Sequence, residues 1–135
     1  MTTDSPIEPG AGPHAIRLPI RWEDLPNFPV RDGVARAGFR GENVLLVMNW
    51  LSKGMTLGLH SHPFEQIAYV ITGRMRWQVG DETFEMGPGE VLRIPPDVMH
   101  GGIPISEETV MNLDIFCPIR EDYLPIVEHQ RADFD

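Results

Sequence analysis

Three histidines stand at spacings that suit a metal site. His60 and His62 are one residue apart within residues 54–73, and His100 follows a Pro-Pro-Asp turn. Residues two apart in a strand project to the same face, so both imidazoles of the first stretch would point to one side. Two imidazoles fit a dry core poorly unless they bind something, and a divalent metal is the usual partner. These residues therefore predict a metal centre with His100 as the third imidazole.

The two stretches resemble the two sequence motifs of the cupin superfamily. In the first motif, Gly54 is followed at the family's spacing by His60, His62, Gln66 and Gly73. In the second motif, Gly89 is followed by Pro95, Asp97 and His100. The resemblance covers roughly residues 40–118 and implies an all-β fold, an antiparallel jelly-roll barrel with the metal inside.

Three positions depart from the family pattern. Gln66 stands where the family usually has a metal-binding Glu, Asp97 where Gly is usual, and Pro104 where the second motif often ends in Asn. Glu65 is one residue too early to replace the missing carboxylate and would point to the opposite face. The resemblance thus implies that the metal ligands are His60, His62, Gln66 and His100.

A site with four neutral ligands leaves the full charge on a divalent ion. That charge favours polarising a carbonyl or hydroxyl and stabilising an enolate or alkoxide. Zinc, nickel, iron and manganese all remain open as the single divalent cofactor. The alternative is a set of buried polar groups that are hydrogen-bonded to one another without metal.

The last long strand expected in the chain places three chemically distinct residues on one face. Asn112, Asp114 and Phe116 alternate with Leu113 and Ile115. A carboxylate in an apolar strand must be paired or bound, so an inward Asp114 is a candidate general acid or base. The alternative is an outward, solvated Asp114.

Two arginines are candidates for contact with a substrate. Arg120 follows a proline and would return over the barrel mouth to clamp a carboxylate, unless it is an ordinary surface residue. Arg93, within Val-Leu-Arg-Ile-Pro, is a candidate lining residue, with a surface salt bridge as the alternative.

Asp114, Phe116 and Arg120, together with Gln66, resemble small cupins of the pectin-degradation type. Those proteins promote ring opening of 4,5-unsaturated uronates to linear keto sugars. The resemblance implies that Asp114 moves a proton, that Arg120 holds the substrate carboxylate, and that Phe116 lines the substrate site. We expect an isomerase or lyase acting on a small molecule. The rival interpretations are an iron- or copper-dependent dioxygenase and a non-catalytic small-molecule-binding module.

The composition fits one globular domain and narrows the range of partners. The chain has 135 residues, 41% of them hydrophobic, and a formal charge of −9, which argues against nucleic acids and anionic membranes as partners. Its one cysteine, Cys117, excludes an internal disulfide. The first residues lack the pattern of a signal peptide, and no apolar run approaches a membrane span, so we expect a cytoplasmic protein.

The pattern of turns divides the chain into three parts. Residues 1–33 form a Pro-rich arm, 34–118 the cupin barrel, and 119–135 a tail packed on or beside it. Strands are expected at 34–40, 42–51, 55–62, 65–72, 74–79, 82–86, 90–94, 99–103 and 108–116. Several of these strands are apolar on both faces, so something must cover the outer face. We expect a homodimer, with cover by the arm alone as the alternative.

Overall fold

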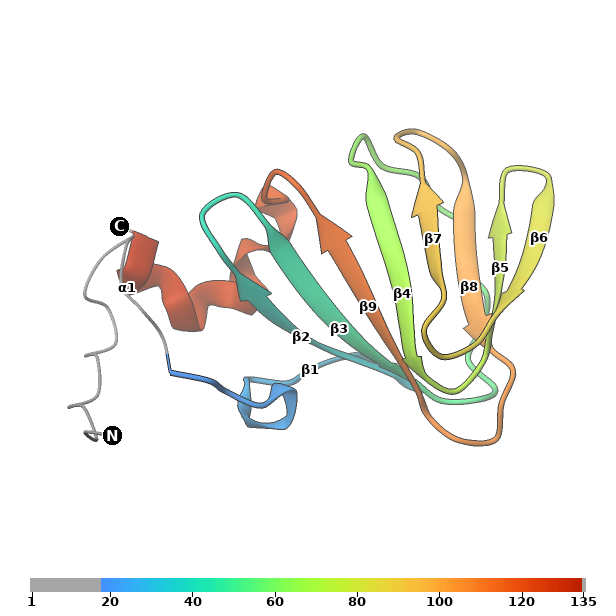
Figure 1. Ribbon diagram of the computed structural model, residues 1–135, viewed down its shortest axis with the longest axis horizontal. Coiled ribbons are helices and arrows are strands. Elements are labelled where there is room, and N and C mark those ends of the chain that lie inside the picture. The colour runs from blue at the N-terminus through green and yellow to red at the C-terminus, as the bar shows by residue number, and fades with distance from the viewer. Residues whose placement is uncertain (1–17, 135) are drawn as a thin grey trace.

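The structure is a computed structural model that describes residues 18–134, and it consists of two antiparallel sheets (Figure 1). The larger sheet has the strand order β1-β2-β3-β9-β4-β7, and the smaller one β6-β5-β8. The strands of the larger sheet are β1 (Phe28–Arg31), β2 (Val34–Arg40), β3 (Leu45–Leu51), β4 (Gln66–Thr72), β7 (Val91–Ile94) and β9 (Val110–Phe116). The smaller sheet contains β5 (Met75–Val79), β6 (Glu82–Met86) and β8 (His100–Pro104).

The expected antiparallel jelly-roll fold is confirmed. Strands β2 and β6 have the predicted limits, and most others differ by one to three residues at an end. The strand expected at 55–62 is wrong, because this segment has no regular ladder partner and makes only one β-bridge, between His60 and His100. Strand β1 lies in the predicted arm, at the edge of the sheet, where Pro29 is tolerated.

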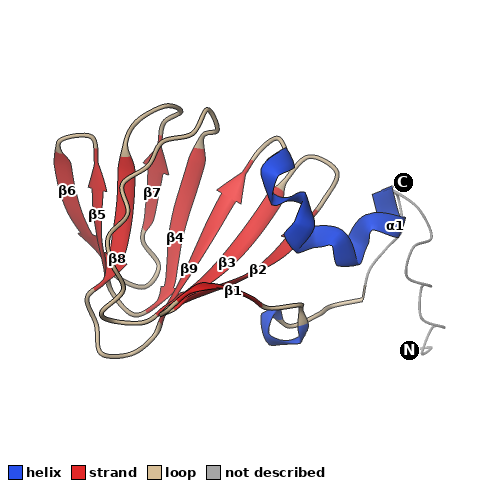
Figure 2. Cartoon of the chain, turned by 180° about the vertical axis from the view of Figure 1, so that it is seen from behind, coloured by secondary structure: helices blue, strands red, loops and turns tan. Residues whose placement is uncertain are grey.

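Three short helical segments flank the sheets: η1 (Trp22–Asp24), η2 (Glu121–Gln130) and α1 (Arg131–Phe134). Figure 2 shows η2 and α1 beside the β2–β3 end of the larger sheet. The Gln130 amide bonds both the N–H and the C=O of Arg40, at 2.8 and 2.9 Å. A Cβ at Gly38 would lie 2.8 Å from Ile126, so this glycine lets the tail approach the sheet closely. Residues 1–17 of the expected arm lie outside the described residues.

The inner face of the larger sheet carries two apolar clusters. One lies toward the smaller sheet and includes Leu51, Val110 and Trp77. The other lies under the tail and includes Leu45, Phe116 and Ile126. Between Leu45 and Leu51 on β3, and between Phe116 and Val110 on β9, the inward positions are partly polar. A band of polar side chains therefore lies between the two apolar clusters.

The outer face of β3, β9 and β4 is apolar and half-buried. Cross-strand rows on this face join Leu46 to Ile115 and Ile67, and Met48 to Leu113 and Tyr69. Of these side chains, only Met48 is fully buried. The neighbouring Phe39 on β2 lines a hollow with residues 18–25, so part of the arm lies beside this face. Within residues 18–134, no helix is long and apolar enough to cross a membrane.

Candidate metal centre and its cavity

The segment between β3 and β4 positions two of the three histidines. His60 and His100 exchange backbone hydrogen bonds of 2.9 and 2.8 Å, which fix the segment against the start of β8. A Cβ at Gly101 would lie 2.8 Å from the carbonyl oxygen of Gly58, so only glycine allows this approach. The convergence of the histidines therefore depends on one bridge and one glycine contact, and not on a continuous strand.

The turn before β8 fixes His62 from the other side. The backbone N–H of Asp97 donates to the carbonyl of His62 at 2.8 Å. Asp97 has φ 65°, in the left-handed region, where Gly is the default and Asp is better tolerated than most residues. This explains in physical terms why the second cupin motif usually has glycine at this position and why aspartate can replace it.

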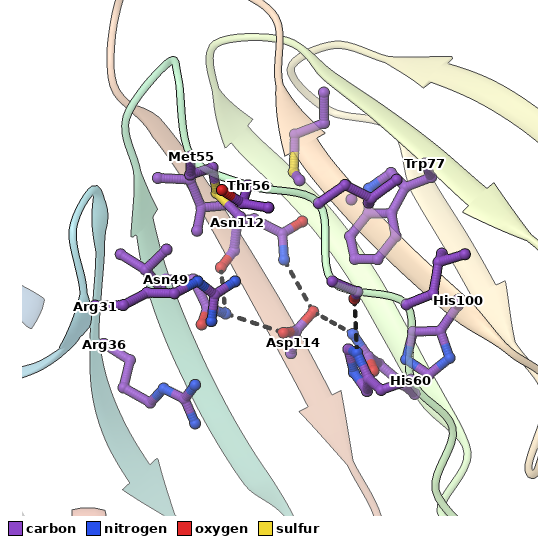
Figure 3. A pocket seen from close by; sticks show the side chains of 18 of the residues that line it. Arg31, Arg36, Asn49, Met55, Thr56, His60, Trp77, His100, Asn112 and Asp114 are labelled. Carbon is purple, nitrogen blue, oxygen red and sulfur yellow. Dashed lines mark hydrogen bonds between the residues drawn. The ribbon is translucent and has the colours of Figure 1, made fainter.

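The three imidazoles form one cluster, and Figure 3 shows His60 and His100 at one end of the cavity. The ring centroids of His60 and His100 are 4.5 Å apart, and those of His62 and His100 are 4.7 Å apart. One ring nitrogen from each residue lies within 4.8 Å of the others. His60 and His100 are on the facing sides of the bridge, while His62 precedes β4.

The Nδ1 atoms of all three rings are held by backbone carbonyls. His60 Nδ1 lies 3.1 Å from the Gly58 oxygen, His62 Nδ1 2.8 Å from that of Phe64, and His100 Nδ1 2.8 Å from that of Val98. A carbonyl only accepts, so each Nδ1 carries the proton and each neutral ring keeps a lone pair on Nε2. Such bonds to the distal nitrogen are the usual support of a metal-binding histidine.

Two Nε2 atoms have no hydrogen-bond donor to pair with within the described residues. His100 Nε2 is buried and has no hydrogen-bond partner. His62 Nε2 lies 3.1 Å from Gln66 Oε1, which sets two acceptors against each other when the imidazole is neutral. Burial is the main cause that lowers the pKa of both His62 and His100, so protonation is disfavoured. The donor set therefore fits a metal ion.

Gln66 joins the histidine cluster to Asp114. Its Oε1 faces His62, while its Nε2 donates to Asp114 Oδ1 at 2.7 Å. A Glu at this position would place two carboxylates at this distance, where like charges repel strongly. Gln in place of the family's usual Glu thus allows a ligand oxygen and an adjacent carboxylate to coexist.

Asp114 points into the cavity from β9 and is held by three amides (Figure 3). Besides Gln66, Asn49 donates to Oδ2 at 2.9 Å and Asn112 to Oδ1 at 2.9 Å. Burial raises the pKa of Asp114 to about 6, although these amides and the charge of Arg36 oppose the shift. A carboxyl that titrates near neutral pH suits proton transfer.

Arg120 also lines the cavity and is almost completely buried. Its Nε and Nη2 donate to the two carboxylate oxygens of Asp122 at 3.1 and 2.6 Å. Its guanidinium carbon lies 4.0 Å from the ring centroid of Tyr123, 4.8 Å from that of Phe116 and 4.9 Å from that of Phe64. The bonds from Arg120 are the main cause that lowers the pKa of Asp122.

The comparisons with known proteins agree with this geometry. A family model described as a cupin domain matches residues 47–116, which is more than half of the chain. This chain belongs to the cupin family. No curated protein shows significant sequence similarity to it.

Solved cupin structures share the fold of this cupin. An RmlC-like cupin from Shewanella frigidimarina is 25% identical, with a TM-score of 0.68 over 75% of this chain and 90% of that one. KdgF from a Halomonas species is 24% identical, with a TM-score of 0.68 over 74% of this chain and 92% of that one. Oxalate decarboxylase from Bacillus subtilis is 24% identical, with a TM-score of 0.64 over 76% of this chain and 30% of that one.

Most residues expected at the site of this cupin surround one cavity of about 450 Å³. Its lining residues include His60, Gln66, His100, Asp114, Phe116 and Arg120, with His62 packed against His100. Arg93 does not line it, because it pairs with Glu65 at the edge of the outer face. The structure therefore favours the salt-bridge alternative for Arg93.

Sequence reasoning missed three polar residues that line the cavity: Arg36, Asn49 and Arg31. Asn49 could have been predicted in the same way as Asp114, because it is a polar residue within a run of apolar residues and is therefore a candidate for an inward-facing site residue. Arg36 alternates with small and apolar residues in β2, which is also a sign that its side chain could point inward.

Proposed function

We propose that this cupin is a metal-dependent, non-redox enzyme that isomerises or ring-opens a small sugar-acid-like substrate. The observation that carries the proposal is the position of Gln66, whose amide joins His62 to Asp114. A proton-transfer group thus lies next to the place where a metal would polarise a substrate oxygen. The resemblance of Asp114, Phe116 and Arg120 to the pectin-degradation cupins points to the same chemistry.

His60, His62, Gln66 and His100 hold one divalent ion in this proposal: zinc, nickel, iron or manganese. All four ligands are neutral, so a bound ion supplies an undiminished positive charge that stabilises negative charge on a substrate oxygen. The backbone bonds to each Nδ1 keep the imidazoles in the tautomer that ligation needs.

Asp114 moves the proton. With a 4,5-unsaturated uronate, it accepts the proton of the anomeric hydroxyl, a carbonyl forms at the anomeric carbon, and the bond from that carbon to the ring oxygen breaks. The electron pair of that bond leaves with the ring oxygen as an enolate. Return of the proton to the enolate carbon gives a linear keto sugar, so the isomerisation needs no oxidant and no co-reactant.

A turnover assay tests this proposal. Metal-loaded protein is incubated with a 4,5-unsaturated uronate, and the loss of the ultraviolet absorbance of the conjugated double bond is followed, with the product identified by NMR. We expect turnover that requires metal and consumes no oxygen. Oxygen uptake with another substrate would favour the dioxygenase interpretation, and binding without turnover would favour a binding module; either result overturns the proposal.

We also propose that the protein is a homodimer that uses the outer face of β3, β9 and β4. The half-buried rows that contain Leu113, Ile115 and Tyr69 support this assembly, because a water-exposed sheet face is normally polar. A two-fold interface would bury the same rows on both copies.

A further inference from the structure

Four residues that line the cavity each have one buried side-chain atom without a hydrogen-bond partner within the described residues. One is His100 Nε2, which the proposed metal accounts for. The other three are Arg36 Nε and Trp77 Nε1, which are donors, and Asn112 Oδ1, which is an acceptor. Buried polar groups are rarely left unpaired, so their gathering in residues around one cavity marks this wall of the cavity as polar and incompletely paired.

Arg36 marks the end of a polar row across the sheet. It is paired in register with Asn49, which is paired with Asn112 on β9. The row ends at Val70 on β4, and Gln66 lies four residues away along that strand. Neighbouring strands are about 4.8 Å apart and residues in a strand rise about 3.3 Å, so three strand spacings and four residues separate the backbones of Arg36 and Gln66 by roughly 20 Å. Figure 3 shows Arg36 and Arg31 on one side of Asp114, with His60 and His100 on the other.

The guanidinium of Arg36 is available to a ligand. Within residues 18–134 it forms no ion pair, and its carbon lies 5.1 Å from the ring centroid of Tyr123, which supports it from one side. The charge of Arg36 lowers the pKa of Asp114, but this effect is the smallest of those that act on the pKa of that carboxyl. Arg31, exposed on the adjacent edge strand, lines the same cavity and forms no ion pair with another residue in the described part of the chain.

Arg120 is a poorer candidate for the same role. Its Nε and Nη2 already bond both oxygens of Asp122, in the bidentate arrangement that a substrate carboxylate would need. The three rings around it hold the guanidinium in that position. Arg120 is therefore committed to the wall of the cavity, whereas Arg36 is not committed to any anion.

We propose that Arg36 is the residue that anchors the carboxylate of the substrate. This inference rests on the proposed function for the substrate class, and it places the ligand in the cavity between Arg36 and the histidine cluster. The carboxylate lies at Arg36, the reacting oxygens lie at the histidine cluster, and Asp114 lies between them. Arg36 thus sets the specificity for acids over neutral sugars.

Calorimetry with metal-loaded protein tests this anchor, with D-galacturonate and D-galactose as probes. We expect the wild type to bind the acid more tightly than the neutral sugar. Arg36→Met weakens galacturonate binding roughly 10- to 100-fold, because a charge-assisted bidentate contact is lost, and leaves galactose binding unchanged. Arg36→Lys keeps the charge but not the fork, so its affinity for the acid is intermediate.

Arg76→Met is the matched control, because Arg76 is exposed on β5 and pairs with Glu85 away from the cavity. Equal affinity of Arg36→Met and wild type for galacturonate would overturn the inference, as would a wild type with no preference for the acid. Thermal unfolding of each variant checks that it folds. The binding preference does not depend on turnover, so an inactive protein that keeps an Arg36-dependent preference contradicts only the proposed reaction.

Discussion

The two faces of β3, β9 and β4 carry opposite chemistry. The inner face presents Asn49, Asp114 and Gln66 to a cavity, whereas the outer face presents rows of Leu, Ile and Tyr side chains. A sheet with one face in water usually shows the reverse pattern. The inversion is the common basis of the two proposals: a polar inner face suits a ligand in the cavity, and an apolar outer face suits contact with a second copy.

Among the variants of the inner face, Asp114→Asn is expected to have the largest effect on activity. We expect kcat/KM for a 4,5-unsaturated uronate to fall roughly 100- to 10,000-fold, because the group that transfers the proton is lost. Metal content should not change, since Asp114 is not a ligand. Asp81→Asn, in the turn between β5 and β6, is the matched control. Full activity of Asp114→Asn would remove its assigned role.

Leu113→Glu tests the outer face. Leu113 lies between Met48 and Tyr69 in the middle of the apolar rows. In the proposed two-fold dimer the new charge would be buried on both copies, so we expect dimerisation to weaken roughly 100-fold or more while metal affinity is kept. Light scattering after size-exclusion chromatography measures the state. Phe84→Glu, an exposed apolar position on β6, should remain dimeric; a monomeric wild type would contradict the assembly.

Gln66→Glu separates the two roles of the Gln66 amide. The new carboxylate should bind metal at least as tightly as Gln66 does, but it replaces the donor that lies 2.7 Å from Asp114. We expect turnover to fall roughly 10- to 100-fold, as is typical when a supporting contact is lost. Gln66→Ala should lose both metal affinity and turnover. Unchanged turnover in Gln66→Glu would show that the bond to Asp114 is dispensable.

The pKa of the Asp114 carboxyl gives a smaller effect that is specific to this residue. In metal-free protein, NMR of its carboxyl carbon should report a pKa of about 6, raised mainly by burial. This pKa exceeds the unfolded value of about 3.9. Asp114 therefore stabilises the metal-free fold fully below about pH 4, and that contribution is lost as the pH rises through about 6. Added metal should lower the pKa, because a cation favours the carboxylate. A midpoint near 4 without metal would contradict the account.

Much of the fold could be predicted because the relevant signals are local. Motif spacing and turn residues located the strands, and period-two alternation put Asp114 and Phe116 on one face. Residues 55–62 show the limit of such reasoning. They alternate as a strand does, but a strand also needs a partner along its length, and only His60 has one. The histidines converge because of a long-range contact that the sequence does not display.

Arg93 and Arg36 show why the site could be predicted only in part. Each arginine lies in a short strand whose residues point alternately to the two faces of the sheet. The sequence does not say which of the two alternating sets of residues faces inward. Ile94 pairs with the inward Gln66, which turns Arg93 outward to Glu65. Gly38 faces the tail, which turns Arg36, two residues earlier on β2, toward the cavity. Pairing register, and not residue type, decided both cases.

The metal content of untagged protein tests the central claim most directly. Protein purified without added metal, and again after metal is added and the excess removed, is measured by elemental analysis for the wild type and His100→Ala. We expect one divalent ion per wild-type chain and an affinity at least about 100-fold lower in His100→Ala, beyond the loss typical of a supporting residue. A wild type that holds no metal even after metal is added would contradict the site and favour a metal-free cluster of hydrogen-bonded polar groups.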